Sequence, residues 1–204
     1  MKKYLVYFLG IVIMTLGISL NYQCGFGSSS VDSLTKNLTD IINVDYLTTG
    51  RILIICNMAF VLAYFLILKP KDIILPIIVS ISLGLFIDLF NALFVIPKIL
   101  ALRILFFVLA LNLISFGVAL TVYYNLSPSP YECMTKIFTD KLFPKLSYGV
   151  CKIIVEAIVI VFTSILSLIF LNGLGEINIA TIIILLVQGP LIDVYLKLLK
   201  KIKI

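Results

Sequence analysis

The sequence predicts an all-α integral membrane protein with six transmembrane helices, built as two inverted three-helix repeats. Three observations predict this class: the composition, six long apolar segments, and a repeat at an offset of 100 residues. The chain is 62% hydrophobic and 13% charged, with a mean hydropathy of +1.20. Soluble domains are about half apolar and about one quarter charged. We therefore expect a single membrane domain, residues 1–204, in contact with a lipid bilayer.

Six apolar segments are long enough to cross a membrane, which takes about 20 residues. They cover residues 4–23, 50–68, 73–96, 100–123, 149–171 and 177–196. The first follows Met1-Lys2-Lys3, as the apolar region of a signal peptide would. Its apolar run is long for a signal peptide, however, and no small-residue cleavage site follows it. We expect an uncleaved first span.

Lysine and arginine predict the orientation, because they concentrate on the cytoplasmic side of membrane proteins. With the N-terminus inside, twelve basic residues lie inside and four lie outside. The inner set is Lys2, Lys3, Lys69, Lys71, Lys136, Lys141, Lys145, Lys152, Lys197, Lys200, Lys201 and Lys203, and the outer set is Lys36, Arg51, Lys98 and Arg103. Both termini are therefore expected in the cytoplasm, and the lysine-rich C-terminal tail is expected to anchor the inner face.

The residue types argue against several other functions. The chain has no histidine, and its four cysteines form no Cys-x-x-Cys pair, so we expect neither a metal site nor a cofactor. No nucleophile–base set or phosphate-binding loop is recognisable, so we do not expect an enzyme. The net charge is +6, but the basic residues flank the apolar segments, so we do not expect nucleic-acid binding.

Two connections are longer than a membrane topology needs, 24–49 and 124–148. In the first, Val31, Leu34 and Leu38 recur at helical spacing, with polar residues such as Asp32 and Asn37 between them. This spacing predicts a short amphipathic helix over 30–42, and a similar pattern predicts another over 130–142. Each either lies on the membrane surface or re-enters the bilayer, and the sequence leaves both readings open.

The internal repeat divides the chain into residues 1–98 and 99–204. Polar and glycine positions carry the alignment: Gly17 matches Gly117, Asp32 matches Glu132, and Thr35-Lys36 matches Thr135-Lys136. Because each repeat holds three spans, an odd number, the second copy must be upside down relative to the first. Inverted repeats are a recurrent plan of secondary transporters, although the same plan also occurs in channels.

The repeated runs also resemble a known family. They are Gly17…Gly25-Phe-Gly-Ser-Ser-Ser-Val-Asp32-Ser-Leu34, its twin Gly117…Ser127-Pro-Ser-Pro-Tyr-Glu132-Cys-Met134, and two Gly-x-x-Ile-Asp runs ending at Asp88 and Asp193. Together they resemble the bacterial YczE/YyaS/YitT membrane proteins, which often carry Gly-x-x-Pro-x-Asp. The first copy has Ser30 in place of the proline, and the second has Glu132 in place of the aspartate. The resemblance implies a six-span protein of the bacterial cytoplasmic membrane and supplies neither a substrate nor catalytic residues.

A solute site is expected near the starts of the two short helices, because a helix start presents free N–H groups and a partial positive charge. Ser129, Pro130 and Glu132 form the pattern of a capping box. The candidate site residues are Ser28, Ser30, Asp32, Ser127, Ser129, Glu132, Asn57 and Glu156. Two plainer readings stay open: Asp32 and Glu132 only cap helices at the membrane surface, and Glu156 pairs with Lys152 one helical turn earlier.

Two ion pairs are expected at the ends of the spans, because a carboxylate in hydrocarbon needs a partner or a cavity. Arg103 is expected to pair with Asp88 on the outer side. Its repeat counterpart, Lys3, is expected to pair with Asp193 on the inner side. These pairs are either structural clasps or gates that break and re-form during transport.

The features together favour a secondary transporter of an unknown small polar solute, working by alternating access of the two halves. Two alternatives stay open. One is a substrate-binding membrane subunit that needs a separate energising partner, and the other is a scaffold or regulator that does not transport. A homo-oligomer is compatible with all three.

Overall fold

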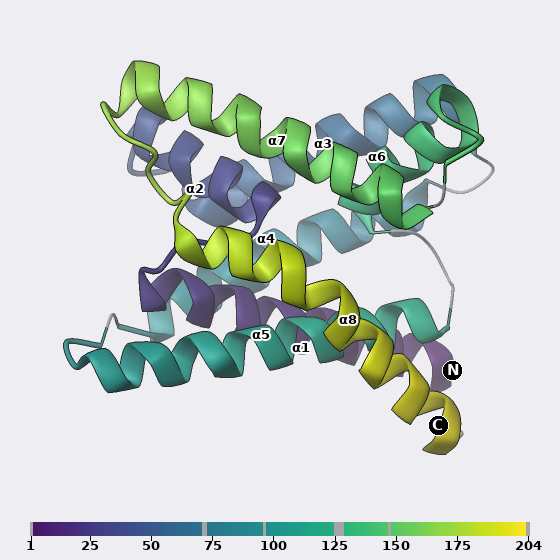
Figure 1. Ribbon diagram of the computed structural model, residues 1–204, viewed down its shortest axis with the longest axis horizontal. Coiled ribbons are helices and arrows are strands. Elements are labelled where there is room, and N and C mark those ends of the chain that lie inside the picture. The colour runs from purple at the N-terminus through teal and green to yellow at the C-terminus, as the bar shows by residue number, and fades with distance from the viewer. Residues whose placement is uncertain (1, 71–72, 96, 125–128, 147, 203–204) are drawn as a thin grey trace. The chain divides into compact units, whose positions relative to one another are not determined.

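The computed structural model describes residues 2–70, 73–95, 97–124, 129–146 and 148–202. Within these ranges the chain forms eight α-helices and one π-helix (Figure 1). In chain order they are α1 Lys2–Cys24, α2 Ser30–Ile42, α3 Thr49–Leu68, α4 Ile74–Leu93, α5 Leu100–Tyr123, α6 Pro130–Ile137, the π-helix η1 Phe138–Leu142, α7 Tyr148–Phe170 and α8 Ile179–Ile202. The prediction of an all-helical protein is confirmed.

Six of these helices are long and apolar enough to cross a membrane, as the sequence predicted. They are Lys3–Cys24, Thr49–Leu68, Ile74–Leu93, Leu100–Tyr123, Val150–Phe170 and Ile179–Ile202. The last is longer than expected: the helix continues beyond residue 196 through Lys197, Lys200 and Lys201. Nothing after Pro190 breaks the helix, and basic side chains in a last turn are favoured by the negative end of the helix dipole.

The chain divides into two compact units. Unit 1 consists of Met1–Ser29, Leu85–Leu126 and Glu176–Ile204, and unit 2 consists of Ser30–Gly84 and Ser127–Gly175. Unit 1 therefore holds α1, α5, α8 and the second half of α4. Unit 2 holds the first half of α4 together with α2, α3, α6, η1 and α7. Both units combine segments from both halves of the sequence.

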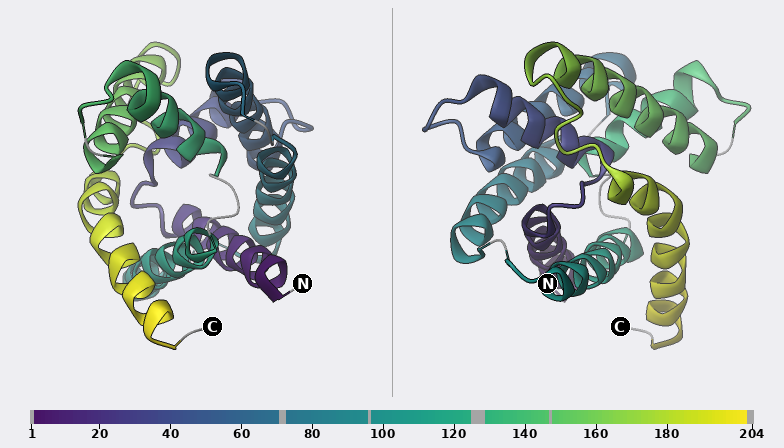
Figure 2. Two further views of the ribbon diagram at one scale, coloured as in Figure 1. Left: turned by 90° about the vertical axis from the view of Figure 1, so that its right-hand side faces the viewer. Right: turned by 60° about the vertical axis from the view of Figure 1, so that its left-hand side comes forward.

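Unit 1 is built on α5, which packs against α1 on one side and α8 on another. The α5–α8 contact contains a cluster of Ala119, Leu120, Ile192 and Leu199. Where α5 and α8 meet, the Tyr195 hydroxyl donates a hydrogen bond to Asn112 Oδ1 at 2.7 Å. The two chain ends lie at the same end of this unit in the views of Figures 1 and 2.

Glycines let α1 and α5 approach closely. A Cβ atom built on Gly117 would lie 2.6 Å from Gly10 O and 2.6 Å from Met14 N. A Cβ atom built on Gly17 would lie 2.8 Å from Ile114 N and 3.0 Å from Ala110 O. Early residues of α1 therefore meet late residues of α5, and the two helices run antiparallel.

In unit 2 the short helices and the long helices alternate as neighbours. Helix α2 packs against α7 and α3, and α6 packs against α3 and α7. Each long helix thus contacts a short helix from its own half of the sequence and one from the other half. The first half of α4 approaches α3 at Gly84, where an added Cβ would lie 2.4 Å from Gly50 O.

The two short helical segments cover residues 30–42 and 130–142, as predicted, but they end differently. Helix α2 stays α-helical, and Asn43 follows it in the left-handed region at φ 46°, with its N–H bonded to Thr39 O at 2.9 Å. Phe143 has φ −134°, and its N–H bonds to Phe138 O, five residues back, at 2.7 Å. Asparagine tolerates the left-handed conformation better than phenylalanine does, which accounts for the wider π turn in the second copy.

Candidate functional site

Helix α2 buries part of its polar side as well as its apolar side. Asp32 is 6% exposed, Ser33 is fully buried and Asn37 is 1% exposed, while Val31 and Leu34 are also buried. A helix lying on a membrane surface keeps its polar face in water. The side chains of Lys36 and Asp40, also on α2, are 31% and 44% exposed, so one part of the polar side is enclosed by protein and another part is exposed.

Asn37 fastens α2 to α7. Its Nδ2 donates to Ser167 Oγ at 2.6 Å and to Leu174 O at 3.1 Å. Ser167 in turn donates to Thr163 O at 2.8 Å, and both α7 side chains are fully buried. The sequence did not predict these hydrogen bonds, which join Asn37 to Ser167 and Leu174, and Ser167 to Thr163. The available signal was Thr163 and Ser167, four residues apart in an otherwise apolar span.

The corresponding contact in the second copy is apolar. Ile137 of α6, the counterpart of Asn37 at an offset of 100, lies in a cluster with Cys133 and Tyr64, and Leu68 packs against it. Burial, reinforced by the neighbouring Glu132 carboxylate, raises the pKa of the Cys133 thiol to about 12. This thiol is therefore a packed apolar group and not a nucleophile.

The predicted capping box at the start of α6 is confirmed. Ser129 N donates to Glu132 Oε2 at 3.1 Å, and Glu132 N donates to Ser129 Oγ at 3.3 Å. Pro130 occupies the first turn. Both Ser129 and Glu132 are half-buried, and Ser127 lies outside the described residues. The Glu132 side chain is therefore already engaged by the helix start.

The remaining candidate residues fall in different elements. Asn57, in α3, is 3% exposed, and Ser30 at the first residue of α2 is 6% exposed. Ser28 belongs to unit 1, where its N–H donates to Glu176 O at 3.2 Å. Unit 2 therefore contains Ser30, Asp32 and Asn57.

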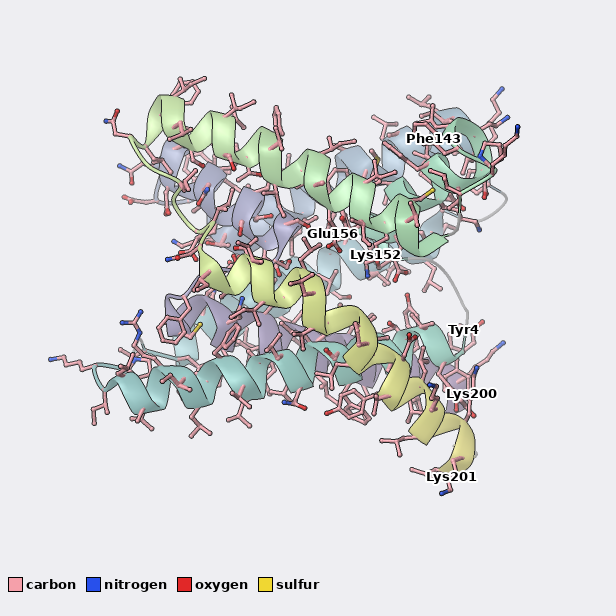
Figure 3. All side chains as sticks on the ribbon, viewed as in Figure 1. Tyr4, Phe143, Lys152, Glu156, Lys200 and Lys201 are labelled. Atoms are coloured by element: carbon pink, nitrogen blue, oxygen red, sulfur yellow. The ribbon has the colours of Figure 1, made fainter. Side chains whose placement is uncertain are left out.

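Glu156 is half-buried on α7, and Lys152 lies one turn before it (Figure 3). The Lys152 ammonium acts electrostatically on the Glu156 carboxylate, and a local pairing of the two stays a prediction. Both predicted roles of Glu156, in a local pair and in solute transport, therefore stay predictions. A carboxylate inside an apolar helix is costly and is most often functional.

Arg103 holds the end of α1. Its Nε donates to Cys24 O at 2.7 Å, and its Nη2 donates to Gly25 O at 3.1 Å. The guanidinium also lies 4.8 Å from the centroid of the Phe26 ring. A cation at a helix C-terminus is favoured by the dipole and by the free carbonyl groups there. Arg103 therefore serves as a cap for α1.

The two predicted ion pairs stay predictions. Asp88, the expected partner of Arg103, is half-buried on α4, and Asp193 is exposed on α8. Lys3, the expected partner of Asp193, places its Nζ 5.1 Å from the centroid of the neighbouring Tyr4 ring.

Comparison with known proteins places the chain in a family. The family model described as "Family of unknown function (DUF6198)" matches residues 1–197. The chain is also similar to a Bacillus subtilis protein, "Uncharacterized protein YyaS": the two are 28% identical over 204 residues, which cover 98% of this chain and 94% of the relative. This match confirms the resemblance drawn from the repeated motifs. No solved structure matches the chain.

Proposed function

Because the chain belongs to the DUF6198 family of unknown function and carries six helices able to cross a membrane, we propose that it is a secondary transporter. It moves a small polar solute by alternating access of two inverted halves, residues 1–98 and 99–204. The symmetry of the α1–α5 contact is the observation that carries this proposal.

The α1–α5 contacts come in pairs related by the repeat. Adding 100 to Gly10 and subtracting 100 from Gly117 converts the Gly10–Gly117 contact into Ala110–Gly17, which is also present. The same operation converts Met14–Gly117 into Ile114–Gly17, again a contact. At a two-fold axis, if residue i of one copy contacts residue j of the other, then residue j of the first copy also contacts residue i of the second. The α1–α5 contacts follow this rule. A two-fold axis between antiparallel helices is what an inverted repeat requires, so these contacts support the proposed arrangement.

The packing in unit 2 supports the same arrangement. Helix α2 of the first half packs on α7 of the second, and α6 of the second half packs on α3 of the first. Each short helix thus packs on the long helix that follows the short helix of the other half. In inverted-repeat transporters, solute sites form where segments of the two repeats meet near broken or short helices.

The proposed solute contacts are the polar side chains of unit 2. Ser30, Asp32 and Asn57 are buried, and Glu156 is a half-buried acid on α7. Ionisable groups inside a membrane protein face its interior or a water-filled cavity, or pair with one another, and they often mark a solute pathway. In this proposal Glu156 is the residue that exchanges a proton or cation during transport.

The test is solute flux into proteoliposomes, with and without an imposed proton gradient, for a panel of small amines, amino acids, sugars and organic anions. We expect gradient-dependent flux of one solute class in the wild type and its loss in Glu156→Gln. Asp140→Asn is the matched control, because it neutralises an exposed acid of the same unit.

The absence of flux for every solute, from protein that is folded and inserted, would count against transport. Recovery of an ATPase partner in native pull-downs would then favour the substrate-binding subunit. Flux that Glu156→Gln leaves unchanged would retain transport and remove Glu156 from its mechanism.

A further inference from the structure

One end of unit 1 gathers the start of α1 and the ends of α5 and α8. Val6 near the start of α1 and Tyr123 at the end of α5 pack against a cluster that contains Leu199 of α8. The three helix ends are therefore held together by apolar contacts. Figure 2 shows the start of α1 and the end of α8 at this same end of the unit.

The surface at this end is cationic. Lys3, Lys197, Lys200 and Lys201 are exposed. Tyr4, Lys200 and Lys201 lie at this end of the unit, as Figure 3 shows. Asp193 is the one acidic residue of α8, and α1 and α5 contain none. The lysines therefore outnumber the acids on these three helices at this end.

Exposed apolar side chains lie among the lysines. Leu198 is 48% exposed, Ile202 is 66% exposed and Tyr4 is 54% exposed. Apolar side chains and lysines thus lie side by side along the last turns of α8. Such a mixed surface suits the boundary of the membrane, where acyl chains meet headgroups. Lysine stems lie along apolar surface while their ammonium groups reach the headgroups, and tyrosine favours the same depth.

The positive-inside preference places these lysines at the cytoplasmic boundary of the membrane, where anionic headgroups concentrate. Helix α4, the repeat counterpart of α8, contains no lysine or arginine. The second copy thus carries a group of basic residues that the first copy lacks, on a helix that stays regular to Ile202.

We propose that this end of unit 1 binds the headgroups of anionic phospholipids. Lys200 and Lys201 contact the phosphate oxygens, Lys197 and Lys3 add to the positive potential, and Leu198 and Ile202 contact the acyl chains. The occupant is a lipid and not a free phosphate, because the apolar side chains beside the lysines are complementary to acyl chains. This binding is independent of the proposed transport.

The experiment measures lipid binding to the full chain purified in detergent. Native mass spectrometry counts bound phosphatidylglycerol and phosphatidylcholine with the same acyl chains, and thermal unfolding is followed in parallel. Lys200→Gln/Lys201→Gln is compared with Lys36→Gln/Lys98→Gln, which removes the same number of charges elsewhere. We expect wild type and control to prefer phosphatidylglycerol, and the α8 variant to lose that preference by roughly thirtyfold.

Equal loss of preference in both double variants would overturn the proposal, because net charge alone would then explain the binding. A wild type with no preference for the anionic lipid would also overturn it. Stabilisation by inorganic phosphate that equals the stabilisation by phosphatidylglycerol would show a free-anion site in place of a lipid site. If the α8 variant unfolds in detergent, Lys200→Arg/Lys201→Arg decides: retained phosphatidylglycerol binding supports the headgroup contact, and lost binding contradicts it.

Discussion

Glycine at single positions decides how closely α1 and α5 approach. Gly117→Ala is expected to destabilise the protein by about 1–3 kcal/mol, the usual cost of overpacking, because the new Cβ would meet backbone atoms of Gly10 and Met14 at 2.6 Å. Gly17→Ala is expected to have a similar effect through Ile114 N. Thermal unfolding in detergent measures both.

Gly189→Ala is the control for this prediction, since no atom beyond its chain neighbours and its own helix backbone lies within 4 Å of the Cβ that it would add. Because Pro190 follows and restricts a preceding alanine, we expect this variant to lose some stability, but less than Gly117→Ala loses. If all three variants unfold at the same temperature as the wild type, the close α1–α5 contact is wrong.

Burial at Cys133 makes a second prediction at the residue scale. With a pKa of about 12 instead of 9.0, the thiolate fraction at pH 8 is about a thousandfold smaller than that of an ordinary thiol. In a variant that retains only this cysteine, maleimide labelling should be very slow at pH 8. It should accelerate as the pH rises toward 12, because a raised thiol pKa delays ionisation.

The control for this labelling is Lys145→Cys in a background without native cysteines, since Lys145 is exposed. Labelling of Cys133 at the rate of that exposed thiol would contradict the buried position of α6 against α3.

At the scale of elements, one residue joins α2 to α7. Asn37→Leu removes both donors to Ser167 and Leu174 O and leaves buried polar groups without partners. An unsatisfied buried group costs about 1–3 kcal/mol, so we expect a clear fall in melting temperature. Lys36→Gln, on the same helix, is the control, because its ion pair with Asp40 is partly exposed and such pairs contribute about 0–1 kcal/mol. If Asn37→Leu melts at the same temperature as Lys36→Gln, the hydrogen bonds of Asn37 to Ser167 and Leu174 do not stabilise the protein.

At the scale of the whole molecule, the prediction concerns orientation. The lysine and arginine distribution predicts that Lys98 faces outward and that Lys200 faces the cytoplasm. With native cysteines replaced, Lys98→Cys should react with a membrane-impermeant maleimide in intact cells, and Lys200→Cys should react only after permeabilisation. The reverse pattern would invert the topology while leaving the repeat unaffected.

Local features of the sequence predicted the elements well. Apolar length alone located all six long helices, and periodicity located the short helical segments at 30–42 and 130–142. The capping box at Ser129 and Glu132 was also correct, because its residues are three positions apart. These features depend on neighbouring residues along the chain, so a sequence can express them directly.

The candidate site was harder to predict, because its contacts join distant residues. Asn37 and Ser167 are 130 positions apart, and nothing in the local sequence of α2 specifies α7 as its partner. Arg103 donates to the carbonyl groups of Cys24 and Gly25 at the end of α1, a contact that the sequence did not predict, and its pairing with Asp88 stays a prediction.

The sequence by itself determined the number and approximate bounds of the spans, the short helices between them and the match between the two halves, because hydrophobicity, periodicity and duplication are properties of the chain. Tertiary structure alone decided that Asp32, Ser33 and Asn37 of α2 are buried and that Gly10, Gly17 and Gly117 lie at the close contact between α1 and α5. Burial and close approach depend on which helices become neighbours, and in this chain the contacts α1–α5, α2–α7 and α3–α6 join opposite halves of the sequence.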